Sequence, residues 1–244
     1  MDKEINHLEG IKLVSFDIWS TLLTTNPVYK DERAKAILAA LCKEEISLEN
    51  MHKIIKEADD ALDRQTEIDG KQYGLKERLY AIYDLLDSSI RVDEMNDDVV
   101  KKFDDVSLEL VSTYLPLVIE DDLLDTLKKL QERGVEMAVM SNTGFIEGKH
   151  MRVALEKLGI LPFMRVQLFS NEIGVAKPDK KIFDAIVDQT GYLPSEILHI
   201  GDNLIADYVG ARNAELKAVW LTKKEENPET PKIAKISDLV KANN

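Results

Sequence analysis

The sequence is poor in several features, and each shortage excludes a class of protein. Only one of the 244 residues is a cysteine, Cys42, so the chain has no internal disulfide and no zinc site made of several thiolates. No apolar run reaches the roughly 18 residues that a membrane-spanning helix needs. Residues 1–6 contain no basic segment followed by an apolar run, as a secretory leader would. We therefore expect a soluble, cytoplasmic protein without a membrane partner.

Basic residues are also in the minority. The chain has 32 Lys and Arg against 45 Asp and Glu, which gives a net charge of -13. This excess of negative charge repels the phosphate backbone of nucleic acids and gives no counterion-release driving force for binding them. We expect no nucleic-acid partner, although a local basic pocket for a small anion stays compatible with the composition. The hydrophobic content of 44% is ample for a large buried core.

The stretch from Phe16 to Leu22 is the strongest chemical signal in the chain. Asp17 comes directly after the apolar residues 11–16, which we expect to form a buried strand. The carboxyl end of a strand is the usual place for chemistry in open α/β sheets. Trp19 follows two residues later, at a position where a second acidic residue is expected.

Residues 27–116 show no convincing strand pattern and instead carry apolar stripes at helical spacing. They predict an all-helical block, long enough to be an independent domain. The stripes lie in residues 48–62, 75–86 and 99–110, with Ser47 and Asp93 placed to open the first and the last helix.

Behind this block, short apolar runs alternate with amphipathic stretches. The alternation predicts an α/β fold, a doubly wound and mostly parallel Rossmann-like sheet with an inserted all-helical cap domain. We expect the core in residues 1–25 and 117–244 and the cap in residues 26–116. Strands are expected at 135–140, 166–169, 197–200 and 217–221. Helices are expected at 123–130, stopped by Gly134, and at 179–190. Three more helices are expected: one ending near Gly159, one running through Ala211 and a short one from Ser237. The charged stretch after Lys223, with Pro228 and Pro231, is expected to be a surface connection.

Polar residues follow four of the expected strands. Because parallel strands place their carboxyl ends at one edge of the sheet, we expect these residues to meet in one crevice. Each alone has a simpler explanation, such as a helix cap, but capping does not account for all four together. They are Asp17, Ser141 with Asn142, Lys177, and Asp202 with Asp207.

Such a set suits phosphoryl transfer. An aspartate such as Asp17 can act as the nucleophile and form an aspartyl-phosphate, which splits one difficult hydrolysis into two steps. Carboxylates from Asp17, Asp202 and Asp207 would repel a phosphate unless Mg²⁺ lay between them. Ser141, expected at a helix start, and the ammonium group of Lys177 would bind the phosphate oxygens.

The order and spacing of these pieces resemble the haloacid dehalogenase-like superfamily, most of whose members are Mg²⁺-dependent phosphohydrolases. The resemblance spans the whole chain, including a helical cap inserted after the first strand. It implies that Asp17 is nucleophile and metal ligand, and that the backbone carbonyl of Trp19 and the carboxylate of Asp202 are further ligands. Asp207 is implied as a supporting acid of the metal site.

For the substrate, the resemblance implies a small phosphorylated metabolite and a cap that opens and closes over the site and sets substrate choice. Phosphate-binding roles fall to Ser141 and Lys177, with Asn142 and Trp19 beside them. Candidate substrate contacts from the cap are Arg64, Lys71, Tyr73 and Arg78.

Trp19 departs from the phosphatase pattern, in which this residue is normally an aspartate that protonates the leaving group. The sequence leaves three hypotheses open: an atypical phosphatase, a metal-independent 2-haloacid dehalogenase that forms an alkyl ester on Asp17, and a non-catalytic protein that binds phosphate and Mg²⁺. The dehalogenases also carry an aromatic residue at this place, but they lack the Gly201-Asp202 pair. Of the histidines, we expect His199 within its strand at the edge of the core and His150 exposed on a helix.

Overall fold

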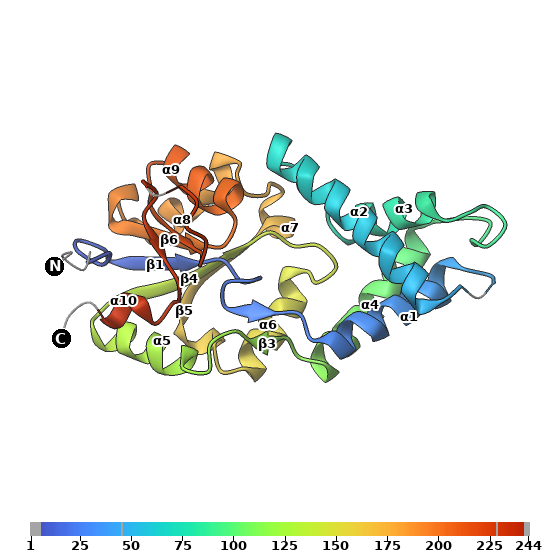
Figure 1. Cartoon of the computed structure of the whole chain (residues 1–244), viewed down its shortest axis with the longest axis horizontal. Helices are drawn as coiled ribbons and strands as arrows, with labels where there is room; N and C mark the ends of the chain where they lie inside the picture. Colours follow the sequence, from blue (N-terminus) through green and yellow to red (C-terminus); the bar gives the residue numbers. More distant parts are fainter. Residues whose placement is uncertain (1–5, 45, 228, 242–244) are drawn as a thin grey trace.

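The computed structural model describes residues 6–44, 46–227 and 229–241. A six-stranded sheet in the order β5-β4-β1-β6-β7-β8 forms the centre of one half of the molecule (Figure 1). All of its neighbouring strands run parallel, which confirms the predicted α/β fold. The strands are β1 (Leu13–Phe16), β4 (Glu136–Ser141), β5 (Met164–Phe169), β6 (Ile197–Gly201), β7 (Lys217–Leu221) and β8 (Lys232–Ile233).

Helices cover both faces of this sheet. On one face, α5, α6 and α10 join an apolar cluster that contains Val14 and Phe16 of β1. On the other, α8 and α9 pack in a second cluster with Leu13 and Ala138. The result is a three-layer sandwich in which the central strands are buried on both sides. The helices are α5 (Leu123–Glu132), α6 (Gly148–Lys157), α7 (Ser170–Ile173), α8 (Lys180–Thr190), α9 (Gly210–Asn213) and α10 (Asp238–Lys241).

Four helices make up the other half of the molecule and pack around an apolar cluster of their own (Figure 1). The chain enters and leaves this half through a short antiparallel ribbon, in which Leu23 pairs with Val118. The division into a core and a cap, with boundaries at 25/26 and 116/117, stays a prediction. The elements are β2 (Leu23–Thr24), α1 (Pro27–Leu41), α2 (Leu48–Asp69), α3 (Leu75–Leu85), α4 (Asp97–Thr113) and β3 (Leu117–Val118).

The start of α4 differs from the prediction. The side chain of Asn96 caps the helix by accepting hydrogen bonds from the backbone of Asp98 and Val99. Asp93 instead forms an ion pair with Lys43 at 2.9 Å. Both residue types are good N-caps, so the sequence alone did not decide between them.

The stretch after Lys223 was predicted as a surface connection up to a short helix from Ser237. This was wrong for residues 232–236. Ile233 pairs with Leu221 in the sheet, and Ile236 is fully buried. The carboxylate of Glu120 accepts hydrogen bonds from the backbone of Ile236 and Ser237, at 2.6 and 3.2 Å. A two-residue strand is stabilised by backbone pairing and carries too few side chains to show a period.

His150 was expected to be exposed, but it is only 3% exposed. Its Nε2 lies 3.5 Å from a carboxylate oxygen of Asp104, because α6 packs against α4. In the part of the chain that the structure describes, no helix combines the length and the apolar character needed to span a membrane.

Candidate active site

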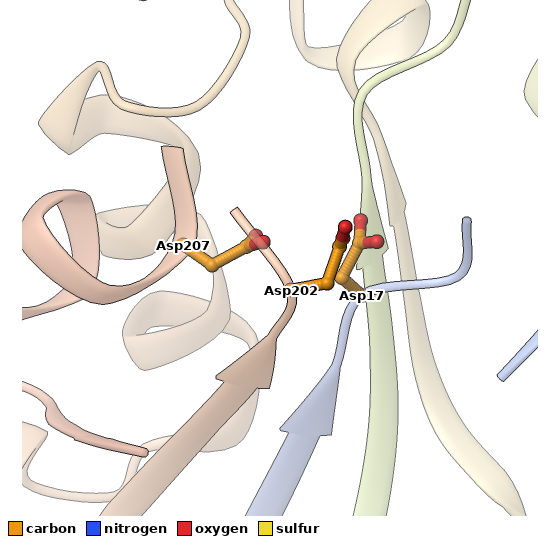
Figure 2. Close-up of side chains that lie close together, drawn as sticks. All are labelled: Asp17, Asp202 and Asp207. Atoms are coloured by element: carbon orange, nitrogen blue, oxygen red, sulfur yellow. The ribbon is translucent and has the colours of Figure 1, made fainter. Parts of the chain in front are cut away.

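Three carboxylates meet beyond the carboxyl ends of the two central strands. β1 leads directly to Asp17, β6 leads to Asp202, and Asp207 lies in a π-helical segment, Leu204–Val209, that follows (Figure 2). One oxygen from each of the three can be chosen so that all lie within 4.8 Å of one another. The predicted crevice at this edge of the sheet therefore brings these acids together.

Lys177 lies at the centre of this acidic group. Its Nζ donates to Asp17 Oδ1 and Asp207 Oδ1, both at 2.6 Å, and to the carbonyl of Met140 at 2.9 Å. Its side chain is 2% exposed. The backbone of Lys177 is held in turn by Asn142, which donates to its carbonyl at 2.9 Å and accepts from its N–H at 2.7 Å. Asn142 therefore positions the lysine through both ends of its amide group.

Asp207 is fixed by several neighbours. Its carboxylate contacts Nε2 of His199 at 3.1 Å and accepts from the backbone N–H of Asn203 at 3.0 Å. Nδ1 of His199 lies 3.1 Å from the hydroxyl of Ser15. A Cβ on Gly201 would lie 2.1 Å from the carboxyl carbon of Asp207, so only glycine allows this close approach.

Burial and repulsion shift the titration of these acids. Burial raises the pKa of Asp17 to about 7, against the opposing effect of Lys177. Burial and the nearby Asp207 raise the pKa of Asp202 to about 6. Burial also disfavours charged Asp207, but Lys177 and His199 outweigh it and lower its pKa. Burial disfavours charged Lys177 as well, but its two carboxylate partners, Asp17 and Asp207, outweigh burial and raise its pKa. Negative charge at Asp17 and Asp202 is therefore incompletely compensated.

This excess of negative charge fits a hard divalent cation. Carboxylate oxygens are the ligands that Mg²⁺ and similar ions prefer. Asp17, Asp202 and Asp207 together carry three negative charges when ionised, and Lys177 supplies one positive charge. A divalent ion between the acids would restore the balance. The donor set is thus suited to a divalent metal.

The site opens into a cavity of about 410 Å³ between the sheet edge and the four helices. Its lining includes most of the predicted site residues, namely Asp17, Trp19, Asn142, Lys177, Asp202, Asp207, Tyr73 and Arg78. Of the other candidates, Ser141, Arg64 and Lys71 are not part of this lining. Ser141 is the last residue of β4 and α6 begins only at Gly148, so the prediction that Ser141 starts a helix was wrong.

The cavity also has lining residues that sequence reasoning missed. Asp59 and Asp63 of α2 were missed; both accept hydrogen bonds at 2.6 Å from Arg78, a predicted residue that packs against Gly144. Asn203 donates to Glu67 at 2.7 Å and links α2 to the loop after β6. The only sequence signal of Asp59, Asp63 and Glu67 was polarity at helix positions, which exposed helix faces share. Further residues missed by the prediction are Tyr29, Arg33, Thr66, Gln72 and Phe145.

Comparison with known proteins agrees with this geometry. A model of the haloacid dehalogenase-like hydrolases matches residues 11–215. The chain belongs to the haloacid dehalogenase-like hydrolase family. This confirms the resemblance drawn from the strand-end residues, and the protein is a hydrolase of that family.

The relatives of this haloacid dehalogenase-like hydrolase differ in activity. It is 26% identical over 215 residues to a glyceraldehyde 3-phosphate phosphatase from Methanopyrus kandleri, a match that covers 86% of this chain and 83% of the relative. Its fold resembles that of YfnB from Bacillus subtilis, solved bound to magnesium, with a TM-score of 0.71, 18% identity and coverage of 94% and 96%. It also resembles a 2-haloacid dehalogenase from Pseudomonas syringae pv. Tomato DC3000, with a TM-score of 0.62, 19% identity and coverage of 95% and 97%. At these identities the two structures show the fold alone.

Proposed function

We propose that the protein is a Mg²⁺-dependent hydrolase of a small phosphorylated metabolite that works through an aspartyl-phosphate on Asp17. The observation that carries the proposal is the convergence of Asp17, Asp202, Asp207 and Lys177 on one cavity. Two acids and a lysine around the nucleophile are the groups expected in a site that binds a metal ion and an anionic substrate. The phosphatase among the relatives supports the same substrate class.

In this mechanism Asp17 attacks the phosphorus atom with one carboxylate oxygen while the P–O bond to the leaving group breaks. Water then hydrolyses the aspartyl-phosphate and releases inorganic phosphate. Asp17, Asp202 and Asp207, with the backbone carbonyl of Trp19, would hold the metal, which would supply positive charge to offset that of the phosphate.

The chain's own residues carry the remaining tasks. Lys177 favours the ionised form of Asp17, against the effect of burial, and adds positive charge beside the transferred group. Asn142 holds Lys177 in place. Ser141 as a phosphate ligand needs its hydroxyl to turn toward the cavity, because it now donates to the carbonyl of Asn142 at 3.2 Å. The three N–H donors of Lys177 also have acceptors already, so Lys177 would act on the phosphate mainly through its charge.

The test is phosphate release from a panel of phosphorylated metabolites. Asp17→Asn removes the nucleophile and should abolish turnover, and a chelator should do the same in the wild-type protein. Asp188→Asn is a matched control, because Asp188 is exposed on α8 and does not line the cavity. Activity that survives both Asp17→Asn and the chelator would sink the proposal.

Trp19 favours a second candidate, metal-independent dehalogenation of 2-haloacids through an alkyl ester on Asp17. An indole cannot protonate a phosphate ester's leaving group, whereas halide leaves without a proton. Halide release in the presence of chelator would support this candidate, and its absence across a panel of short 2-haloacids would remove it. If neither phosphate nor halide is released, the non-catalytic hypothesis is left, with metal binding as its readout.

A further inference from the structure

Two buried polar groups on α1 have no partner. The hydroxyl of Tyr29 and Nε of Arg33 are inaccessible to solvent and form no hydrogen bond of normal geometry, although the Tyr29 hydroxyl lies near Ser107 and Arg33. Tyr29 as a whole is only 2% exposed. Buried polar groups are nearly always hydrogen-bonded in native proteins, and exceptions call for an explanation.

Both groups lie in the same small region of the cap. Tyr29 and Arg33 are four residues apart on a helix and therefore share a face. The guanidinium carbon of Arg33 lies 4.4 Å from the ring centre of Phe145 and 5.8 Å from that of Tyr29. The aromatic rings thus hold the guanidinium in a fixed place without using its hydrogen-bond donors.

The nearby acids do not neutralise Arg33. The carboxylate of Asp59 is within electrostatic range of it, but both Asp59 and Asp63 are hydrogen-bonded to Arg78 at 2.6 Å. Among the described residues, no carboxylate forms an ion pair with Arg33 comparable to these.

Tyr29, Arg33 and Phe145 line the same cavity as Asp17 and Lys177. We propose that Tyr29 and Arg33 bind an anionic oxygen group, a carboxylate or a second phosphate, at the end of the substrate remote from the phosphate that Asp17 attacks. The proposal rests on the proposed function and narrows its substrate class to phosphate esters with a second oxyanion. A group that accepts hydrogen bonds would satisfy both atoms, because the Tyr29 hydroxyl can donate and Arg33 Nε carries an N–H.

The chemistry of Tyr29 is consistent with this role. Burial raises the pKa of its phenol, which therefore stays protonated and able to donate. The hydroxyl and the guanidinium together provide charge-assisted hydrogen bonds to a planar carboxylate or a tetrahedral phosphate. A neutral leaving group of the same length would leave both donors unsatisfied, which is how a polar site rejects a substrate that lacks its partner group.

The experiment uses matched pairs of substrates. Series of ω-carboxyalkyl phosphates and alkanediol bisphosphates of increasing chain length are each compared with the n-alkyl phosphate of equal length. At one length, kcat/KM for the oxyanion-bearing member should exceed that of its neutral partner by about 10- to 100-fold. The two series distinguish a carboxylate from a second phosphate.

The variants then locate the preference. Arg33→Gln should bring the ratio close to unity, and Tyr29→Phe, which keeps the ring, should lower it by about 3- to 10-fold. The ratio of the two kcat/KM values does not change when part of the enzyme is unfolded. If Arg33→Gln does not fold, Tyr29→Phe provides the test. The control is Lys30→Gln, which removes an equal charge from an exposed position on the same helix and should leave the ratio unchanged.

The outcomes separate the two proposals. Hydrolysis of alkyl phosphates without any preference for a second oxyanion overturns the Tyr29–Arg33 subsite and leaves the proposed function standing. A preference that Arg33→Gln leaves unchanged also overturns the subsite. If nothing is hydrolysed, calorimetric binding of the corresponding phosphonate pairs decides. Tighter binding of the phosphonate with a second oxyanion, lost in Arg33→Gln, would support the subsite while the proposed function fails. Equal binding of the two phosphonates would overturn the subsite and the proposed function.

Discussion

Replacing Lys177 should destabilise the protein far more than replacing an ordinary lysine. The side chain of Lys177 is 2% exposed and makes two ion pairs of 2.6 Å with carboxylates whose side chains are 10% and 3% exposed. In Lys177→Met the stem is retained in apolar form and the charge is lost. Two buried acids, Asp17 and Asp207, then face each other without compensation.

The magnitude follows from the general cost of breaking a buried ion pair. Removal of one partner typically costs about 3–5 kcal/mol, because the remaining charge stays buried and unpaired. Since Lys177 has two partners, we expect a loss toward the upper part of that range when a chelator is present. Protonation of Asp17, whose pKa is already raised to about 7, limits the loss because the acid can become neutral.

The assay is urea unfolding, followed by tryptophan fluorescence, of wild type and variant in chelator and in saturating Mg²⁺. A bound cation should replace part of the lost charge, so the difference between the two proteins should shrink in Mg²⁺. The control is Lys180→Met, because Lys180 forms an exposed ion pair with Asp184 and its loss should change little. Similar urea slopes would exclude a change in the unfolded state.

A loss below about 1 kcal/mol in chelator, the ordinary effect of a point substitution, would refute the reasoning about the buried ion pairs. A difference that Mg²⁺ leaves unchanged would separately contradict the metal site. The two conditions thus test the lysine and the cation independently.

Three further predictions concern the same site. Trp19→Asp should raise phosphate release from an unactivated alkyl phosphate by about 10²- to 10⁴-fold, since it supplies a general acid; an unchanged rate would contradict this. Gly201→Ala should weaken Mg²⁺ binding and turnover together, because the new Cβ would lie 2.1 Å from the carboxyl carbon of Asp207; normal Mg²⁺ titration by calorimetry would contradict it. Mg²⁺ affinity should fall as the pH falls through about 7 and about 6, because protons then compete for Asp17 and Asp202. A Mg²⁺ affinity that does not change across a pH series spanning both values would refute the raised pKa values of these two acids.

The sheet and its acidic edge could be predicted because their signals are local and strong. The apolar run before Asp17 and the run before Asp202 are bounded by turn residues, and the carboxyl ends of parallel strands meet without further information. The position of Lys177 beside both Asp17 and Asp207 needed coordinates, because its loop packs there through Asn142 and not through any periodic pattern.

Other parts of the site depend on contacts between distant segments and leave no signal of their own. His199 was expected to be a strand residue of the core, and it is buried, but its contact with Asp207 depends on the π-helical segment that follows β6. α1 was not predicted as a separate helix, because its apolar residues lie on all sides of the helix and form no stripe at helical spacing.

Because Trp19 is not an acid, another residue must donate the proton to the leaving group. Cap carboxylates in the described lining of the cavity come only from α2, and two of the three are held by Arg78. The third is Glu67, which accepts a hydrogen bond from Asn203, the neighbour of Asp202 in the sequence. Glu67 is thus the carboxylate of α2 in this lining that no guanidinium holds. If Trp19→Asp leaves the rate unchanged because the cap already supplies the acid, Glu67 is therefore the residue to which that function falls.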